Sequence, residues 1–317
     1  MSVFRPYVEN VENVENVENV ENNHFEETFF NKTQPVQYAN LNSDMPAYKK
    51  WSFEFFKARC SEILCQVSDN LEDPANITRK ISISEYIDLM KNGEHCPYMT
   101  GWSYQKILPE LDDDIFFPKF HPDDFIDRLP KRMQFRRRWV FFGKKGINCD
   151  LHIDCFSTSA WLLMIEGQKT FRAISPLHRH HIEMGSSLFN EGIVSHLDKL
   201  NVEIFEFTLT PGTILYVPTG WVHEIRNDTD NIMVTGGFTS RQHAIRFYKN
   251  YHSYISRDSN ESDIAFNDYL EALTEDKLKI SDEVRDSIIE EVAYTKEKIE
   301  ILLRKNKVYE EIIKKTA

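Results

Sequence analysis

The chain has 317 residues, of which 41% are hydrophobic and 13% aromatic, enough for one well-buried domain with appendages or at most two domains. Its formal net charge of -12 argues against a general nucleic-acid-binding protein, because such proteins need clustered positive charge to hold phosphates. No apolar run is long enough to span a membrane, and the first residues lack the apolar segment of a signal peptide. We therefore expect an intracellular protein without a membrane partner, cytoplasmic, with a nuclear location also open.

The five cysteines are odd in number and contain no Cys-x-x-Cys pair, so they indicate neither a disulfide framework nor a zinc site. We expect all five to be reduced thiols. Cys155 is expected to be a small buried side chain that points away from its neighbour Asp154.

Residues 1–30 contain a low-complexity acidic repeat. From Val8 to Asn22 the triplet Val-Glu-Asn occurs five times. A period of three rotates the valine by about 60° per repeat on a helix, and it alternates between the two faces of a strand. Neither regular structure would give the segment a continuous apolar face, so we predict a disordered acidic tail through about residue 30.

Residues 31–130 alternate short helix and strand signals, and we expect an α+β region that packs on the core. Ser52 has the position of a helix N-cap before an aromatic run. Ser82 to Glu85 has the capping-box pattern of a helix that ends near Asn92. The strands expected in this region are the short runs 35–41 and 63–67.

Residues 131–245 carry the pattern of a β-rich core. The strands from Trp139 to about Phe238 are short, apolar and separated by turn signals, as in closed or double-sheet β structures. One pair of these strands is expected on either side of a turn at Gly167. Residues 131–145 hold seven bases and no acid, so they form either a solvated strand edge or a surface for an acidic substrate or partner.

Two further segments accompany this core pattern. Residues 178–201 form a polar insert between core strands, and its adjacent histidines should diverge on a loop instead of binding a metal. Towards the C-terminus the pattern is helical, with one candidate helix over 264–273 and a second that begins at Ser281 with apolar residues along one side. We expect residues 246–317 to be a helical region that either packs on the core or forms a dimer interface.

Three metal-capable side chains lie within the core pattern. His152 and Asp154 are two residues apart in an apolar run, so they should point to the same side of a β-strand. His223 follows the strand-like run from Thr213 to Val217 and is the candidate third ligand. Two histidines and one carboxylate can hold one face of a non-haem Fe(II) ion and leave the opposite positions open for a cosubstrate and oxygen.

The motifs HID, TSAW, GQK, TPGTILYVPTGWVHEIRN and VTGGF occur between residues 152 and 238. In order and spacing they resemble the JmjC and cupin-like branch of the Fe(II)- and 2-oxoglutarate-dependent oxygenases, nearest the branch that includes a nuclear lysyl hydroxylase of splicing factors. The resemblance covers roughly residues 80–240. It implies a mainly β fold with flanking helices, built on a double-stranded β-helix, or jelly roll.

The resemblance also implies roles for five residues. His152, Asp154 and His223 match the iron ligands of the family. Lys169 matches the lysine that pairs with the far carboxylate of 2-oxoglutarate, and Thr235 matches the threonine that hydrogen-bonds the same group. The presence of Asp154 implies hydroxylation and not halogenation, because halogenases of the family vacate that position for chloride.

Three positions depart from the pattern of this branch. Cys149 stands where the branch often has threonine, and Leu162 and Gly237 stand where it often has asparagine. Because the residues usual at the first two positions help to hold the cosubstrate, these departures concern cosubstrate affinity and the identity of the substrate. They leave the iron ligands unchanged.

The resemblance implies an Fe(II)- and 2-oxoglutarate-dependent dioxygenase that uses O2 to hydroxylate a protein side chain, lysyl-type first, and releases succinate and CO2. The substrate would be a protein or peptide, and family members dimerise through C-terminal helices, which supports a homodimer here. The sequence leaves open whether hydroxylation proceeds to demethylation.

Two alternatives remain beside this interpretation. One is a hydroxylase of a small molecule, such as a free amino acid or a peptide natural product, whose positive charge would pair with Glu224 and Glu166. The other is a non-catalytic cupin-like scaffold that binds partners through its acidic tail and C-terminal helices. A nucleic-acid substrate ranks lower because of the negative charge.

Overall fold

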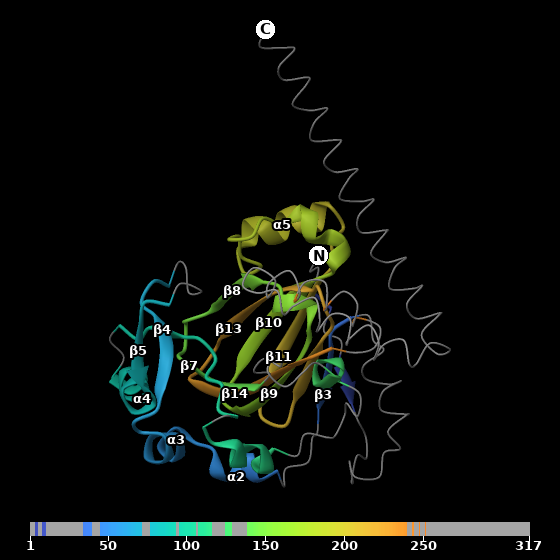
Figure 1. Cartoon of the computed structure of the whole chain (residues 1–317). Helices are drawn as coiled ribbons and strands as arrows, with labels where there is room; N and C mark the ends of the chain where they lie inside the picture. Colours follow the sequence, from blue (N-terminus) through green and yellow to red (C-terminus); the bar gives the residue numbers. More distant parts are fainter. Residues whose placement is uncertain are drawn as a thin grey trace, which may run out of the picture.

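Two β-sheets form the centre of the protein in the computed structural model (Figure 1). The structure describes residues 4–5, 8–10, 34–39, 45–71, 77–92, 95–105, 107–115, 124–128 and 138–239, together with residues 243, 247 and 251. Most neighbouring strands are antiparallel, and helices are few. The predicted mainly β, jelly-roll class is therefore confirmed.

The first sheet has five strands in the order β1-β11-β10-β13-β8. These strands are β1 Phe4–Arg5, β11 Ile204–Leu209, β10 Lys169–Ile174, β13 Val222–Asn227 and β8 Cys149–His152. The second sheet has six strands in the order β2-β3-β12-β9-β14-β7. They are β2 Val8–Asn10, β3 Val36–Ala39, β12 Ile214–Val217, β9 Ser159–Glu166, β14 Asn231–Phe238 and β7 Arg138–Gly143.

The space between the sheets is filled by side chains that alternate along each strand. In β9, Ala160, Leu162 and Met164 point into this inner cluster, whereas Trp161 and Leu163 belong to the cluster on the opposite face. The strand is buried on both faces, which explains why its sequence is apolar without a polar alternation. The predicted turn at Gly167 joins β9 to β10 with a φ of 82°, a conformation that glycine adopts without strain.

The N-terminal region covers the outer face of the six-stranded sheet. It contains the predicted helix starts: the Ser52 hydroxyl accepts from the N–H of Phe55 at 3.1 Å, and the Ser82 hydroxyl accepts from the N–H of Glu85 at 3.0 Å. Its elements are α2 Pro46–Lys50, α3 Phe53–Arg59, α4 Ile83–Asn92, the 3-10 helices η3 Pro109–Asp114 and η4 Phe125–Arg128, and a small sheet of β5 Arg79–Ser82, β4 Leu64–Ser68 and β6 Tyr98–Met99.

The insert between β10 and β11 covers the outer face of the five-stranded sheet. It contains the 3-10 helix η6 Pro176–His181 and the helix α5 Glu191–Lys199. Asn190 caps α5, because its side-chain oxygen accepts from the N–H groups of Gly192 and Ile193. Figure 1 shows α5 and the helices α2 and α3 on opposite sides of the two sheets. The adjacent histidines, which were expected on a loop, lie instead in η6, and the polar insert also contains a helix, α5, of which Leu197 is buried.

The predictions for the two ends of the chain can be compared with the structure only in part. Strands β1 and β2 lie inside the segment predicted to be disordered, and each pairs in parallel with an edge strand, β1 with β11 and β2 with β3. The other residues of 1–30, and the helices expected over 246–317, lie outside the described residues. No helix in the described part of the chain is long and apolar enough to cross a membrane.

Candidate metal centre

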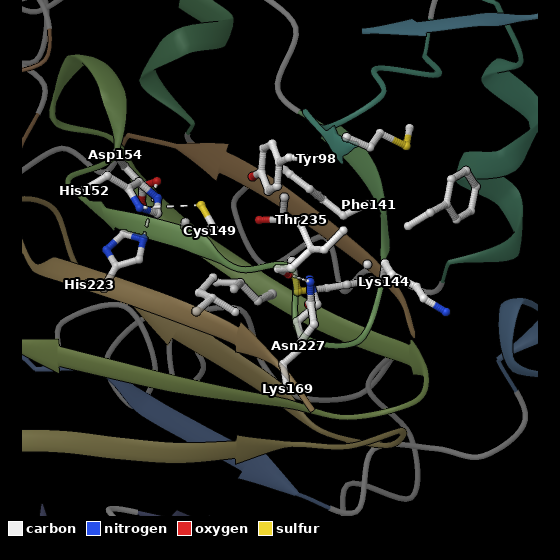
Figure 2. A pocket seen from close by; sticks show the side chains of 18 of the residues that line it. Tyr98, Phe141, Lys144, Cys149, His152, Asp154, Lys169, His223, Asn227 and Thr235 are labelled. Atoms are coloured by element: carbon white, nitrogen blue, oxygen red, sulfur yellow. Dashed lines mark hydrogen bonds and ion pairs between the residues drawn. The ribbon is translucent and has the colours of Figure 1, made fainter. Parts of the chain in front are cut away.

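His152, Asp154 and His223 lie together at one end of the space between the sheets (Figure 2). One ligand atom from each residue lies within 4.8 Å of the other two. The two imidazole centroids are 4.1 Å apart, and His223 Nε2 lies 4.0 Å from an Asp154 oxygen. The two histidines meet because β8 and β13 are antiparallel neighbours with His152 directly opposite His223. One metal ion could bridge all three groups after small side-chain rotations.

Asp154 reaches this cluster by a route different from the predicted one. Strand β8 ends at His152, so Asp154 is not on a strand, and it precedes the 3-10 turn η5 Cys155–Ser157. Within that turn Phe156 and Ser157 have φ values of 57° and 58°, a left-handed conformation that is costly for residues with a side chain. Thr219 donates to the Ser157 carbonyl at 2.6 Å and so helps to hold the turn.

Hydrogen bonds prepare both histidines to bind a metal through the same atom. His152 Nδ1 lies 2.7 Å from the carbonyl of Asp150, and His223 Nδ1 lies 3.0 Å from the carbonyl of Trp221. Because a carbonyl oxygen can only accept, each Nδ1 carries a proton, and Nε2 is the nitrogen that can offer a lone pair to a metal. Imidazoles that ligate metals are commonly oriented in this way.

Burial of the cluster favours a bound cation. Burial lowers the pKa of His223 well below its ordinary value, and the neighbouring His152 lowers it further. Burial also raises the pKa of Asp154, although His152 opposes that shift. A buried carboxylate and a buried neutral imidazole are both stabilised by a positive ion between them. The donor set of two imidazoles and one carboxylate therefore fits a divalent metal such as Fe(II).

A cavity leads from the three residues into the protein, as Figure 2 shows. The cavity has a volume of about 90 Å³, several times the space that one water molecule needs. Its walls are mostly apolar, with Lys169 and Thr235 among the few polar groups away from the metal-capable cluster. The cavity thus has room for a small ligand between a metal and these two residues.

Lys169 is a buried cation at the wall of this cavity. Its side chain is 4% exposed, and it forms no ion pair with any residue that the structure describes. Its ammonium lies 5.7 Å from the ring centre of Phe141. Burial lowers its pKa to about 8, although Cys149 opposes that shift. An unpaired buried ammonium is costly, so this position fits an anionic ligand.

Thr235 lies on β14, across the cavity from Lys169 (Figure 2). Its hydroxyl donates to the carbonyl of Trp161 at 2.7 Å. To donate to a ligand in the cavity it would have to rotate away from that carbonyl, whereas its oxygen can accept without moving.

The departures Cys149 and Leu162 both line the cavity. The Cys149 sulfur lies 3.7 Å from His152 Nδ1, and Leu162 is buried in the wall. The structure adds Tyr98, on β6, and Asn227, at the end of β13, which sequence reasoning missed. Asn227 ends the motif that contains His223, although nothing in that motif marks it as a cavity residue, and Tyr98 lies in no motif. Both reach the cavity through the packing of their strands.

Several other expectations are corrected. Cys155 is exposed and not buried. Glu224 faces away from the cavity: Ser187 Oγ and the N–H of Leu188 donate to its carboxylate, so it is not available to a cationic substrate. Glu166 is exposed at the end of β9.

Within the described part of the basic stretch, Lys144 contributes to the wall of the cavity. Arg138 pairs with Asp112 at 2.8 Å and Lys144 with Asp230 at 3.2 Å, whereas residues 131–137 lie outside the described part. Among the residues that the structure describes, His152, Asp154 and His223 are the group whose ligand atoms lie close enough together to hold a metal ion. That the insert histidines bind no metal stays a prediction.

Comparison with known proteins agrees with this geometry. Residues 22–242 match the family described as a cupin-like domain. The lysine-specific demethylase JMJ21 of Arabidopsis thaliana is 25% identical over 232 residues, which are 67% of this chain and 24% of that protein. The bifunctional arginine demethylase and lysyl-hydroxylase psr-1 of Caenorhabditis elegans is 25% identical over 237 residues, 68% of this chain and 58% of that protein.

A third relative is the arginine-specific demethylase JMJ20 of Arabidopsis thaliana, 24% identical over 250 residues, which are 66% of this chain and 53% of that protein. The chain spans less than two thirds of the length of each of these three relatives. The family match, by contrast, covers more than half of this chain, from the N-terminal region through the last strand of the core. The chain belongs to the cupin-like domain family of JmjC type.

Proposed function

We propose that the protein is an Fe(II)- and 2-oxoglutarate-dependent oxygenase that hydroxylates a side chain of another protein, with lysine as the first candidate. One observation carries the proposal: the cavity has a cluster of two histidines and one aspartate at one end, and on its wall a buried lysine with no ion-pair partner among the described residues. A metal and an anionic cosubstrate would satisfy both groups at once.

Each half of the site has its own task. His152 and His223 would offer Nε2 to the metal, and Asp154 would offer a carboxylate oxygen. Lys169 would neutralise the far carboxylate of 2-oxoglutarate through a charge-assisted contact. Thr235 would donate a hydrogen bond to the same carboxylate after its hydroxyl rotates away from the Trp161 carbonyl. Bound iron and 2-oxoglutarate would supply the oxidising chemistry, in which O2 gives one oxygen atom to the substrate and one to succinate as CO2 leaves.

The walls of the cavity have a third task, which is to exclude water. Leu162 and Ala160 from β9, Met233 from β14 and Phe141 from β7 are apolar and contribute to the lining. A dry cavity strengthens the contact between Lys169 and an anion, and it protects an oxidising centre from bulk water.

The relatives support a protein substrate. Their names describe demethylases of lysine or arginine, and in one case a lysyl-hydroxylase. Glu224, which could have recognised a cationic small molecule, is engaged elsewhere. We therefore place a protein lysyl or arginyl side chain ahead of a free amino acid as the substrate.

Succinate production tests the proposal. The purified chain is incubated with Fe(II), 2-oxoglutarate and O2, with one panel of lysine- and arginine-containing peptides and one of free amino acids. We expect substrate-dependent succinate in the peptide panel and a product heavier by one oxygen atom. With N-methylated copies of the same peptides, release of formaldehyde together with loss of the methyl group would indicate demethylation. His152→Ala should abolish the signal, because it removes a metal ligand.

Two outcomes would contradict the proposal. Turnover confined to free amino acids would favour a small-molecule hydroxylase. Protein that neither takes up a divalent metal nor makes succinate above the level of His152→Ala would favour a non-catalytic scaffold.

A further inference from the structure

We propose that Glu224 is a positioning residue: it ties the insert of residues 175–203 to the back of the strand that carries His223, and so fixes the geometry of the metal centre. This inference rests on the proposed function, because it assumes that His223 binds a metal. It assigns a task to the insert, which no motif of the sequence explains.

The first step is the alternation of side chains along the strands that carry the histidines. His223 faces the cavity, whereas its neighbours Val222 and Glu224 face the insert. On β8, Leu151 precedes His152 and is likewise buried against the insert. Both metal-binding histidines are therefore backed by residues that pack on the insert.

The insert and these strands share one apolar cluster. Its fully or nearly buried members come from β8, β10, β11, β13 and the insert, and Ile153, between His152 and Asp154, packs against it. The buried members are Leu151, Ile174, Ile182, Leu188, Leu197, Val202, Ile204 and Val222. The cluster is separate from the one between the two sheets, so the insert forms a layer of its own behind the metal centre.

The second step is the pair of polar contacts that hold Leu188 of the insert. The Glu224 carboxylate, 5% exposed, accepts from the N–H of Leu188 at 2.5 Å and from Ser187 Oγ at 2.8 Å. Arg172 donates from its guanidinium to the carbonyl of Leu188 at 2.8 Å. Arg172 and Glu224 lie opposite each other on β10 and β13, so the backbone of one insert residue is held from two neighbouring strands.

Neighbouring groups fix this arrangement further. Arg172 also donates to Glu206 of β11 at 2.6 Å, and the ring of Phe189 lies 4.5 Å from its guanidinium carbon and 4.7 Å from that of Arg226. On the inner face of the sheet, Phe171 of the cluster between the two sheets stacks on His223 with a centroid distance of 5.1 Å. The strand segment that bears His223 is thus held on one face by Phe171 and on the other by the insert.

Loss of the Glu224 contacts should widen the range of positions that His223 Nε2 can occupy. A ligand that samples more positions binds a metal less tightly, because binding must then restrict it. Lys169 lies further along the sheet, where it is the residue of β10 directly opposite Asn227 of β13. The position of the Lys169 side chain should therefore change less than that of His223.

The experiment measures Co(II) binding, a spectroscopic substitute for Fe(II), in the full chain without cosubstrate. We compare the unmodified chain with Glu224→Ala, Glu224→Gln and the control Asp228→Asn. Asp228 accepts from Thr170 at 2.6 Å and from Arg226 at 3.0 Å, but it follows the end of β13 that lies away from His223. The control therefore removes a hydrogen-bonded carboxylate at a distance from the metal centre.

We expect Glu224→Ala to weaken Co(II) binding on the order of tenfold and to change the visible absorption of the bound ion. Glu224→Gln should recover part of the affinity, since its amide oxygen can still accept from the N–H of Leu188. Asp228→Asn should leave both affinity and absorption unchanged, even if thermal unfolding shows a similar loss of stability for both carboxylate variants.

Other outcomes separate the inference from the proposed function. Equal Co(II) affinity and an identical spectrum in Glu224→Ala would overturn the positioning role and leave the metal centre in place. An unmodified chain that takes up no Co(II) would instead overturn the proposed function, and with it the inference. If Glu224→Ala does not fold, Ser187→Ala, which keeps the Leu188 contact, must weaken Co(II) binding in the same direction for the inference to survive.

Discussion

Lys169 shows how a single residue can serve binding at the expense of stability. Its ammonium is buried without an ion-pair partner among the described residues, and burial lowers its pKa from the ordinary 10.5 to about 8. The unfolded chain therefore binds more protons than the folded chain between these two pH values. The destabilising effect of this group is full below pH 8 and fades as the pH rises towards 10.5.

Removal of this charge should stabilise the ligand-free protein. We expect Lys169→Met to raise the free energy of unfolding at pH 7 by about 3 kcal/mol, the order of magnitude that follows from the lowered pKa. The same variant should lose 2-oxoglutarate binding. Urea unfolding and ligand titration measure the two effects. Lys144→Met is the control, because Lys144 pairs with Asp230 and should give no such gain.

The lowered pKa also predicts a pH dependence for cosubstrate binding. Only the protonated amine attracts a carboxylate, so 2-oxoglutarate affinity should fall above pH 8, roughly tenfold per pH unit. Lys169→Arg keeps its charge at these pH values and should bind with an affinity that changes little between pH 7 and 9. Titrations of both proteins with 2-oxoglutarate at pH 7 and pH 9 measure these affinities. An equal fall in affinity in the unmodified chain and in Lys169→Arg would show that a group other than Lys169 causes the pH dependence.

Gly236 is a residue whose identity follows from packing. A Cβ atom at this position would lie 2.3 Å from a ring carbon of Trp161, whereas at the adjacent Gly237 the nearest atom would be 3.6 Å away. We expect Gly236→Ala to cost about 1–3 kcal/mol through overpacking, and Gly237→Ala to cost much less. Thermal unfolding of the two variants compares them directly, and equal losses would rule out the clash as the cause.

At the scale of elements, the metal centre depends on a turn and two strands that come from distant parts of the chain. The β8–β13 pairing brings His152 opposite His223, and the turn after β8 brings Asp154 to the same point. Thr219, in the loop before β13, donates to the Ser157 carbonyl of that turn. This hydrogen bond links the two halves of the site outside the metal itself.

We expect Thr219→Val to release the turn. The variant keeps the shape of the side chain but loses one hydrogen bond, which should lower stability by about 0.5–1.5 kcal/mol. Metal affinity should fall as well, because Asp154 is then less well placed. Thr219→Ser retains the hydroxyl and should restore metal affinity. If Thr219→Val binds Co(II) as tightly as the unmodified chain, the turn does not position Asp154.

At the scale of the molecule, the two sheets form a sandwich whose outer faces are both covered. The N-terminal region covers the six-stranded sheet, and the insert covers the five-stranded sheet. The inner cluster between the sheets is continuous with the walls of the cavity, since Leu162, Ile225 and Met233 belong to both. Ligand binding should therefore increase the free energy of unfolding of the whole domain.

Thermal unfolding with ligands tests this coupling. A ligand that binds only the folded chain adds about 2.7 kcal/mol at a concentration of 100 times its Kd. Because one 2-oxoglutarate molecule would contact both Lys169 and the metal, we expect it to raise Tm more with Mn(II) present than without it. In His152→Ala, Mn(II) should no longer increase the Tm shift that 2-oxoglutarate causes. If Mn(II) increases that shift as much as in the unmodified chain, 2-oxoglutarate does not contact a metal held by His152.

The sequence by itself determined the class of fold, most of the strands and the identity of the candidate metal cluster. Strands β9 and β10 lie on either side of the predicted turn at Gly167, and the caps at Ser52 and Ser82 form as expected. These features depend on neighbouring residues, through alternation, capping and turn geometry, so they can be read locally. The family motifs indicated that His152 and His223 bind the same metal ion, and the structure places the two side chains next to each other.

Only the tertiary structure decided what surrounds these residues. It places Asp154 on a turn, exposes Cys155, turns Glu224 towards the insert and brings Tyr98 from a separate small sheet into the cavity wall. Each of these outcomes depends on strand register and on which layer covers which face, and both are set by contacts between residues far apart in the chain. A periodic pattern in the sequence shows which side chains lie on the same face of a strand. It does not show which other part of the protein packs against that face.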